Sequence, residues 1–105
     1  MDIKVTKQGK RKQLHFSGEM SIYAAQTAKE IIFSDIEQYQ ELHFHLAEIS
    51  EIDCTGIQLL LLTAQVCEEK SINFIIDDIS ENILDTLTFI NLSNTFDKHL
   101  PLNQG

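Results

Sequence analysis

A change in hydrophobic spacing near the middle of the chain most constrains what this sequence can fold into. Leu42, Phe44 and Leu46 alternate with polar residues, and this period of two predicts a strand with one apolar face. Residues 57–62 then form a nearly continuous apolar run, which Ala64 extends at helical spacing. A helix this apolar must be largely buried. The middle of the chain is therefore expected to pass from a buried strand, through a short acidic turn, into a buried helix.

The acidic turn carries the candidate functional residues. Asp53 is placed to act as a helix N-cap, because its carboxylate can accept hydrogen bonds from the unpaired N–H groups of the first turn. Cys54 and Thr55 then lie at a helix N-terminus, where the macrodipole favours negative charge by about 0.3–1 kcal/mol. A phosphate group or a thiolate would be stabilised there. We therefore expect the function of the chain to reside at this turn.

Local patterns predict the remaining elements. Apolar and polar residues alternate on both sides of Gly9, which indicates an entry hairpin. Ser21 and Ser80 are the expected N-caps of two further helices. Residues 72–76 are apolar on both faces, as is typical of a strand in a sheet that is covered on both sides. In chain order we expect strands at 3–6 and 14–17, a helix at 22–39, a strand at 41–46, a helix from 54 to about 70, a strand at 72–76 and a helix from 81 to about 90.

This order of elements predicts an α/β sandwich in which helices pack on a small mixed sheet. An antiparallel entry hairpin is followed by right-handed strand–helix–strand crossovers, in the order β-β-α-β-α-β-α. The 105 residues contain no internal repeat or linker, so we expect one domain over residues 1–105. Apolar residues at 91–96 are expected to close the core, and the chain from about residue 101 is expected to be frayed.

Composition and charge narrow the location and the partners. No run of 18 apolar residues occurs and the N-terminus lacks the apolar core of a signal peptide, so we expect a cytoplasmic protein without membrane insertion. Cys54 and Cys67 fall at opposite ends of one predicted helix and cannot bridge, which fits a reducing compartment. The net charge is −8, and five of the eight Lys and Arg lie in the first twelve residues. The acidic remainder argues against a nucleic-acid partner.

The motif Asp-Cys-Thr-Gly at residues 53–56, placed between a strand and an apolar helix, resembles the signature of STAS domains, the family of bacterial anti-sigma factor antagonists. Residues 14–18 resemble the second strand of the family and its glycine, and residues 71–76 resemble its last strand. Residues 79–96 are similar to its closing helix and apolar tail. The resemblance covers nearly the whole chain and implies the same fold.

The resemblance also implies a regulatory role in signal transduction and transcription. Family members dock on a kinase-like anti-sigma factor, or on another signalling partner, through this turn and the helix after it. In members that are switched by phosphorylation, a partner kinase modifies the residue after the Asp. That position is Cys54 here, so Thr55 is the remaining hydroxyl that could carry a phosphate. The implied partner-binding residues are Glu19, Asp53, Cys54, Thr55, Gly56 and Gln58.

Two other functions stay open. Some STAS domains are small subunits that bind the ATPase of a lipid-transporting ABC complex, and residues 55–61 would suit that role equally. Alternatively, Cys54 is the reactive thiol of a redox sensor or thiol enzyme, because a helix N-terminus activates thiols, although the neighbouring Asp53 opposes this effect.

Other chemistry has little support in the sequence. The chain contains neither a Gly-x-Ser-x-Gly elbow nor a glycine-rich phosphate loop, so we expect no enzyme activity and no cofactor. His43 and His45 share one strand face at a spacing that metal ligands can use. No obvious third ligand accompanies them, so we expect no metal site.

Overall fold

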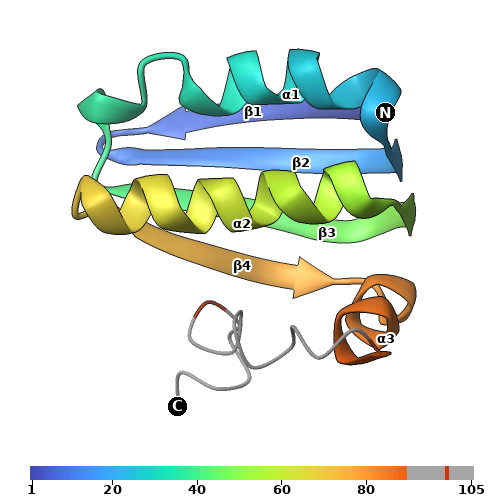
Figure 1. Cartoon of the computed structure of the whole chain (residues 1–105). Coiled ribbons are helices and arrows are strands. Elements are labelled where there is room, and N and C mark those ends of the chain that lie inside the picture. The colour runs from blue at the N-terminus through green and yellow to red at the C-terminus, as the bar shows by residue number, and fades with distance from the viewer. Residues whose placement is uncertain (90–98, 100–105) are drawn as a thin grey trace.

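The computed structural model describes residues 1–89 and 99, in which a four-stranded sheet packs against helices (Figure 1). The predicted α/β fold and the predicted order of its strands and helices are confirmed. The elements are β1 (Asp2–Gln8), β2 (Arg11–Met20), α1 (Ile22–Phe33), the 3-10 turn η1 (Ile36–Gln38), β3 (Glu41–Ile52), α2 (Cys54–Glu69), β4 (Asn73–Ile79) and α3 (Glu81–Phe89).

The strands lie in the sheet in chain order, with β1 antiparallel to β2 and with β2, β3 and β4 parallel to one another. Gly9 takes a φ of 56° in the turn of the entry hairpin, as its position in the sequence predicted. Helices α1 and α2 lie side by side over one face of the sheet, and α3 lies beyond the end of β4 (Figure 1). Because β2 and β3 are parallel, their C-terminal ends meet the starts of α1 and α2 at the same edge.

The core lies between the sheet and the two helices. Phe16, Phe44 and Phe74 come from three neighbouring strands, and their rings contact edge to face with centroids 4.8 and 4.9 Å apart. Leu60 of α2 is fully buried in the same cluster. The apolar run at residues 57–62 therefore forms the buried helix that its spacing predicted.

Helix α1 ends at Phe33, so the prediction of one helix over residues 22–39 is wrong. Asp35 adopts a left-handed backbone conformation with a φ of 55°, which interrupts the helix before η1. The buried Lys12 stabilises this end, because its Nζ donates to the Ile31 carbonyl oxygen at 2.7 Å and to Asp35 Oδ1 at 3.0 Å. Lys12 thus satisfies groups that the end of a helix leaves unpaired.

Strand β3 continues to Ile52, well beyond the predicted strand at residues 41–46. A short acidic turn was expected between this strand and the next helix, yet residues 48–52 all belong to the strand because they pair with the end of β2. In this register Gly18 lies opposite Ile49, and Met20 lies opposite Ile52. The connection from β3 to α2 is therefore Asp53 alone.

The prediction that residues 72–76 are covered on both faces is wrong. Within the described sheet, β4 is the last strand and pairs with β3 only. Phe74 and Ile76 are buried toward the core, whereas Ile75 is half-buried and Asn73 is exposed. The predicted helix after Ser80 is present as α3. The predicted closing segment at 91–96 and the predicted fraying from residue 101 lie outside the described residues.

Candidate functional site

Asp53 joins the starts of two helices. Its Oδ1 accepts a hydrogen bond from the Gly56 N–H at 3.0 Å, which confirms the predicted N-cap of α2. Its Oδ2 accepts a second bond, at 3.1 Å, from the N–H of Ile22, the first residue of α1. Both carboxylate oxygens thus satisfy N–H groups that helix starts leave unpaired. These bonds, with that from Gly56 foremost, hold the pKa of Asp53 below its ordinary value.

The two serines predicted as caps differ in what they bind. Ser21 precedes α1 but makes no side-chain capping hydrogen bond, and Asp53 serves in its place. Ser80 Oγ accepts from the Ile83 N–H at 3.4 Å, as predicted, and donates to the Ile49 carbonyl oxygen at 3.0 Å. Ser80 therefore ties the start of α3 to β3 shortly before the turn.

Gly56 lies where no larger residue fits. A Cβ atom at this position would lie 2.6 Å from the Met20 carbonyl oxygen and 2.7 Å from Ile52 Cγ1. Both distances are shorter than ordinary van der Waals contacts, so the first turn of α2 can approach β2 and β3 this closely only with glycine. Gly56 is buried beneath the surface of the site, where it allows the close packing of α2 on the two strands.

The other residues predicted to contact a partner lie at the surface of the same edge. Cys54 and Gln58 are exposed at the start of α2, and Thr55 is half-buried between them. Glu19 is exposed at the end of β2, where the strand register places it opposite Glu51 of β3. The structure therefore brings Glu19 and the start of α2 together from distant parts of the sequence.

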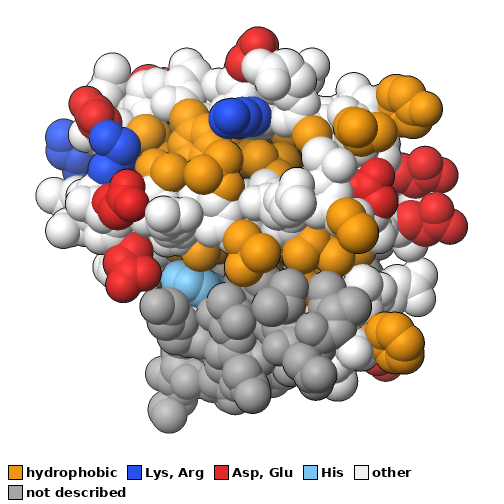
Figure 2. Space-filling view, in the orientation of Figure 1, with side chains coloured by type: hydrophobic (Ala, Val, Ile, Leu, Met, Phe, Trp, Pro, Cys, Tyr) orange, Lys and Arg blue, Asp and Glu red, His pale blue; other side chains and the backbone are white. Residues whose placement is uncertain are grey.

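Sequence reasoning missed two residues of this edge, Ile22 and Tyr23. Their relative exposures are 62% and 95%, unusually large for apolar side chains of this size. The signal was present in the sequence, because the apolar stripe of α1 begins at Ala24 and leaves both residues outside it. Apolar and acidic side chains gather over the starts of α1 and α2, at the right of Figure 2.

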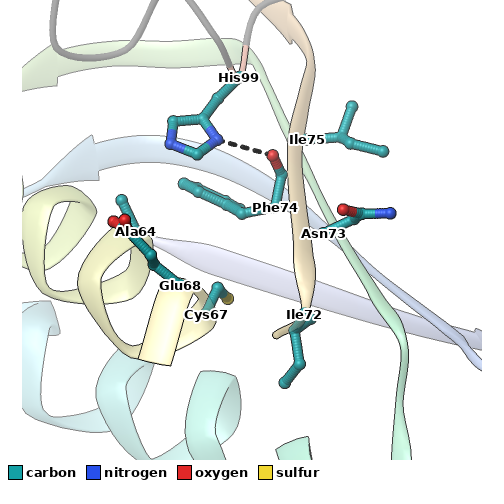
Figure 3. A pocket seen from close by; sticks show the side chains of 8 residues that line it. All are labelled: Ala64, Cys67, Glu68, Ile72, Asn73, Phe74, Ile75 and His99. Atoms are coloured by element: carbon teal, nitrogen blue, oxygen red, sulfur yellow. Dashed lines mark hydrogen bonds between the residues drawn. The ribbon is translucent and has the colours of Figure 1, made fainter. Parts of the chain in front are cut away.

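Cys67 lies apart from this edge, in a cavity of about 450 Å³ between α2 and β4 (Figure 3). Ala64, Ile72 and Phe74 line the cavity with it, and His99 donates from Nδ1 to the Phe74 carbonyl oxygen at 2.8 Å. Burial raises the pKa of the Cys67 thiol to about 11, because an ionised thiolate is poorly solvated there. Cys67 is therefore an unreactive core residue, and both cysteines are free.

The histidines predicted to share a strand face do so, and carboxylates surround them. His43 contacts Asp77 and Glu41, and His45 contacts Asp78. In the described part of the chain, no three or more His, Cys, Asp or Glu side chains are grouped so that they could hold a metal ion.

None of the described helices combines the length and the apolar character that crossing a bilayer requires.

These features can be set beside those of known proteins. The model of the STAS domain family matches residues 2–103. The chain belongs to the STAS domain family. This confirms the resemblance drawn from the motif at residues 53–56. No curated protein matches the sequence.

Solved structures share the STAS fold at low sequence identity. The anti-sigma factor antagonist SpoIIAA in its unphosphorylated form matches with a TM-score of 0.76 and 14% identity, over 94% of this chain and 85% of that one. An anti-sigma factor antagonist from Mycobacterium paratuberculosis gives 0.76 and 15%, over 90% and 80% of the two chains. A sulfate transporter family protein from Wolinella succinogenes gives 0.75 and 16%, over 92% and 80%.

Proposed function

We propose that this STAS domain is a regulatory protein–protein interaction module that docks on a kinase-like anti-sigma factor or a related signalling protein. The observation that carries the proposal is the exposed pair Ile22 and Tyr23, which Asp53 holds beside the start of α2. Exposed aromatic residues are frequent anchors of protein interfaces. The docking surface comprises Glu19, Ile22, Tyr23, Cys54, Thr55 and Gln58.

The charge at the docking surface supports a partner with a basic contact region. Glu19 and Glu51 lie opposite each other on neighbouring strands, and like charges in that arrangement destabilise a sheet. Asp53 adds a third carboxylate at the same edge, and its lowered pKa keeps it ionised. Cationic side chains of a partner would relieve this repulsion. Docking is then expected to weaken as salt is added, because salt screens exposed charges.

Phosphorylation of Thr55 would switch such docking off. A phosphate adds about −1.5 to −2 charge at neutral pH. The helix dipole of α2 tolerates this charge, since Thr55 lies in its first turn. Thr55 is half-buried between the exposed Cys54 and Gln58, so its phosphate would lie within the proposed docking surface. Partner release follows from steric overlap and from desolvation of the phosphate. SpoIIAA, which shares the fold, is solved both unphosphorylated and phosphorylated, so phosphorylation is the first modification to test.

The docking proposal is tested by capture and titration. The purified chain is used to retain proteins from its own organism, the partner is identified by mass spectrometry, and the purified partner is then titrated. We expect Tyr23→Ser to weaken binding at least about tenfold, as the loss of an interface anchor does. Val5→Thr on β1 is the matched control, because Val5 is also exposed and apolar but lies outside the docking surface.

Equal affinities for the wild type and Tyr23→Ser would contradict this docking surface. A captured kinase-like anti-sigma factor would support the proposal, whereas a captured ATPase of a lipid-transporting ABC complex would favour the accessory-subunit alternative.

Intact-mass measurement of the native protein, with and without phosphatase, tests the proposed phosphorylation of Thr55. We expect a phosphatase-sensitive gain of about 80 Da, one phosphate, that Thr55→Ala removes and Cys54→Ala keeps. Oxidised Cys54 in place of phosphate would favour the redox alternative.

A further inference from the structure

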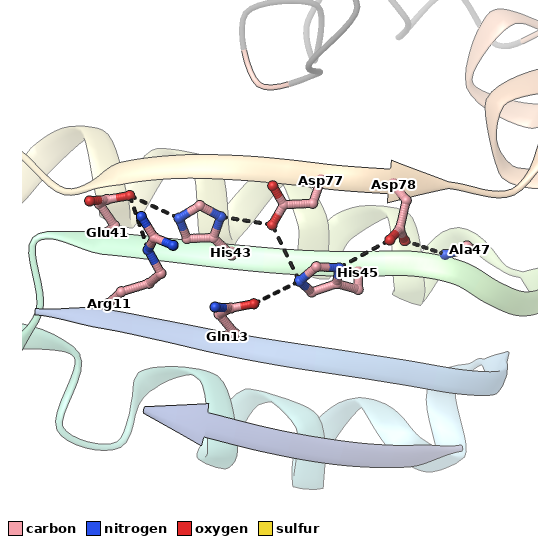
Figure 4. Close-up of polar contacts among 8 residues, drawn as sticks. All are labelled: Arg11, Gln13, Glu41, His43, His45, Ala47, Asp77 and Asp78. Carbon is pink, nitrogen blue, oxygen red and sulfur yellow. Dashed lines mark hydrogen bonds and ion pairs between the residues drawn. The ribbon is translucent and has the colours of Figure 1, made fainter. Parts of the chain in front are cut away.

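A row of histidines and carboxylates crosses β3 and β4 on the sheet face opposite α1 and α2 (Figure 4). It consists of Glu41, His43, His45, Asp77 and Asp78. His43 and His45 alternate along β3 with the buried Leu42, Phe44 and Leu46, so they point away from the helices.

Both ring nitrogens of His43 meet a carboxylate. Nδ1 lies 2.7 Å from Asp77 Oδ2, and Nε2 lies 2.9 Å from Glu41 Oε1. An ionised carboxylate only accepts hydrogen bonds, and a neutral imidazole has one N–H and one lone pair. Two such bonds can therefore form only when His43 carries a proton on each nitrogen. His43 is 7% exposed, so water can replace little of either bond.

His45 repeats the arrangement one step along the strand. Its Nδ1 lies 3.0 Å from Asp78 Oδ2, and its Nε2 lies 3.3 Å from Asp77 Oδ2 and 3.0 Å from Gln13 Oε1. Three acceptors again face two ring nitrogens, which favours the doubly protonated ring. Asp77 Oδ2 contacts both histidines and links the two rings into one row.

The row crosses a weak point in the backbone pairing of β3 and β4. Phe44 pairs with Ile76 but His45 pairs with Asp78, so Asp77 is an extra residue in β4. Asp78 Oδ1 accepts from the Ala47 N–H at 2.9 Å and so replaces a backbone acceptor. At this bulge the side-chain bonds of Asp77 and Asp78 add to the interrupted ladder between β4 and β3.

Other charged groups face the row from the neighbouring strands. Arg11 of β2 lies 3.5 Å from Glu41 Oε1, and the His15 ring stacks on His45 with centroids 4.0 Å apart. Lys4 of β1 and Glu48 of β3 line the depression beside His15 and His45. Asp2 of β1 lines the adjoining depression with Lys4, His15 and Glu48, so both signs of charge flank the row on this side.

We propose that this row is a proton-dependent clamp, in which protonated His43 and His45 hold β4 to β3 and loss of their protons loosens the junction. Histidine is the side chain that ordinarily changes charge between pH 5 and 8, so the clamp would respond near neutral pH. Deprotonation leaves at least one carboxylate facing a ring lone pair on each histidine, which replaces attraction by repulsion. The proposal does not depend on the proposed docking function.

Two carboxylates of the row, Glu41 and Asp78, do not titrate in this range. The hydrogen bond from His43 is the main reason that the pKa of Glu41 lies below its ordinary value. Partial burial acts to raise the pKa of Asp78, but bonds from His45 and the Ala47 N–H together lower it. Both groups are therefore ionised from pH 5 to 8, and neither of them accounts for a change of the clamp in that range.

Loosening would reach the rest of the protein through α3. β4 leads into Ser80, which binds the Ile49 carbonyl oxygen, and Asn82 Nδ2 donates to the Ser50 carbonyl oxygen at 3.2 Å. These contacts hold the final residues of β3, which lead directly to Asp53. If β4 separates from β3, these contacts weaken, and the end of β3 and the adjoining residue Asp53 are held less firmly at the start of α2.

Nitrogen-15 NMR of the wild-type protein tests the protonation directly. At pH 6 we expect both ring nitrogens of His43 and of His45 to show the chemical shifts of protonated nitrogen. Neutral-imidazole shifts for both residues at pH 6 would overturn the proposal. This measurement needs no variant, so it does not depend on whether a substituted chain folds.

Denaturation by urea between pH 6 and 8.5 tests the energetic effect. We expect the unfolding equilibrium constant of the wild type to rise at least about tenfold over this range, as for one hydrogen bond to a charged group. The double variant His43→Gln and His45→Gln should lose most of this dependence. His15→Gln is the control and should keep it, since His15 stacks on His45 and forms no ion pair with a carboxylate in the described part of the chain. The same pH dependence in the double variant would overturn the proposal.

Discussion

The absence of a Cβ atom at Gly56 allows the first turn of α2 to pack closely on β2 and β3. We expect Gly56→Ala to destabilise the protein by about 1–3 kcal/mol, the usual cost of forcing extra atoms into a packed region. The cost arises because the nearest contact of the new Cβ is a backbone oxygen, that of Met20, which cannot rotate away as a side chain can. Denaturation by urea measures the loss.

Gly9 supplies the matched control for Gly56→Ala. A Cβ at Gly9 would meet nothing within 4 Å, and asparagine tolerates the positive φ of this turn. We therefore expect Gly9→Asn to change the unfolding free energy by less than about 0.5 kcal/mol. Equal stability of Gly56→Ala and Gly9→Asn would mean that the first turn of α2 can shift outward at little cost.

Asp53→Asn is a sharper test of the cap than Asp53→Ala. Asparagine is in general as good an N-cap as aspartate. Here, however, both carboxylate oxygens accept from backbone N–H groups, those of Gly56 and Ile22. An asparagine amide would turn one acceptor into a donor that faces a donor. We expect Asp53→Asn to lower the urea midpoint, whereas Ser21→Ala, which removes no capping bond, leaves it nearly unchanged.

The Asp53 contribution should depend on pH with a definite sign. Its pKa in the folded protein is lowered from 3.8, so the folded state favours the ionised carboxylate. The stabilisation is present above pH 3.8 and is lost as the pH falls through the lowered folded pKa. The stability difference between wild type and Asp53→Asn should therefore shrink below pH 3.8. A difference that stays constant from neutral pH to acid would show that the charge of Asp53 does not contribute.

At the scale of single residues, local contacts were predictable and distant ones were not. The N-cap role of Asp53 follows from a bond to Gly56 three positions along, whereas its bond to Ile22 spans 31 positions. Lys12 lies two residues from Leu14 and so shares the buried face of β2, where a lysine is rarely found. The carbonyl groups at the end of α1 and the Asp35 carboxylate, which are distant in sequence, explain its burial.

Among the elements, the end of α1 depends on a residue from another element. We expect Lys12→Met to destabilise the protein by about 3 kcal/mol, because the loss of a buried cation leaves its partners unpaired. Those partners are the carbonyl oxygens of Ile31, Ile32 and Ser34. Asp35 also loses its contact with Lys12 but keeps its ion pair with Lys7. Thermal or urea unfolding, with amide exchange in α1, measures the effect.

Lys10→Met is the control for this prediction, since Lys10 is exposed in the hairpin turn. A change of less than about 0.5 kcal/mol is expected there. A similarly small change for Lys12→Met would indicate that the methionine packs well enough to replace the buried cation, as apolar substitutes sometimes do. Faster exchange confined to the last turn of α1 would identify the lost carbonyl contacts as the cause.

Element boundaries were less predictable than element types. The apolar spacing of α1 continues to Ile36, but the left-handed Asp35 breaks the helix, and no local pattern fixed that conformation. The extent of β3 was underestimated because acidic residues at 48 and 51 are typical of turns. Pairing with the end of β2 overrides that tendency.

For the whole molecule, the topology could be predicted because the hydrophobic period changes clearly between strands and helices. The mixed sheet, its entry hairpin and its crossovers follow from that order. The sequence did not reveal that one face of the sheet carries the row of histidines and carboxylates, because Ile75 made β4 look apolar on both faces. Within the proposed docking surface, Ile22 and Tyr23 were not foreseen, since they reach it through the parallel pairing of β2 and β3.

The double hydrogen bond of Asp53 also has a consequence for folding kinetics. Contacts between distant positions usually form after local ones, because closing a long loop costs entropy first. If the bond to Ile22 forms after the transition state, Asp53→Asn will speed unfolding and leave refolding nearly unchanged, which stopped-flow mixing would reveal. A nascent or partly folded chain would then lack part of the proposed docking surface. The protein would become competent to bind only as its folding finishes, so that a partner would never be sequestered by an unfinished chain.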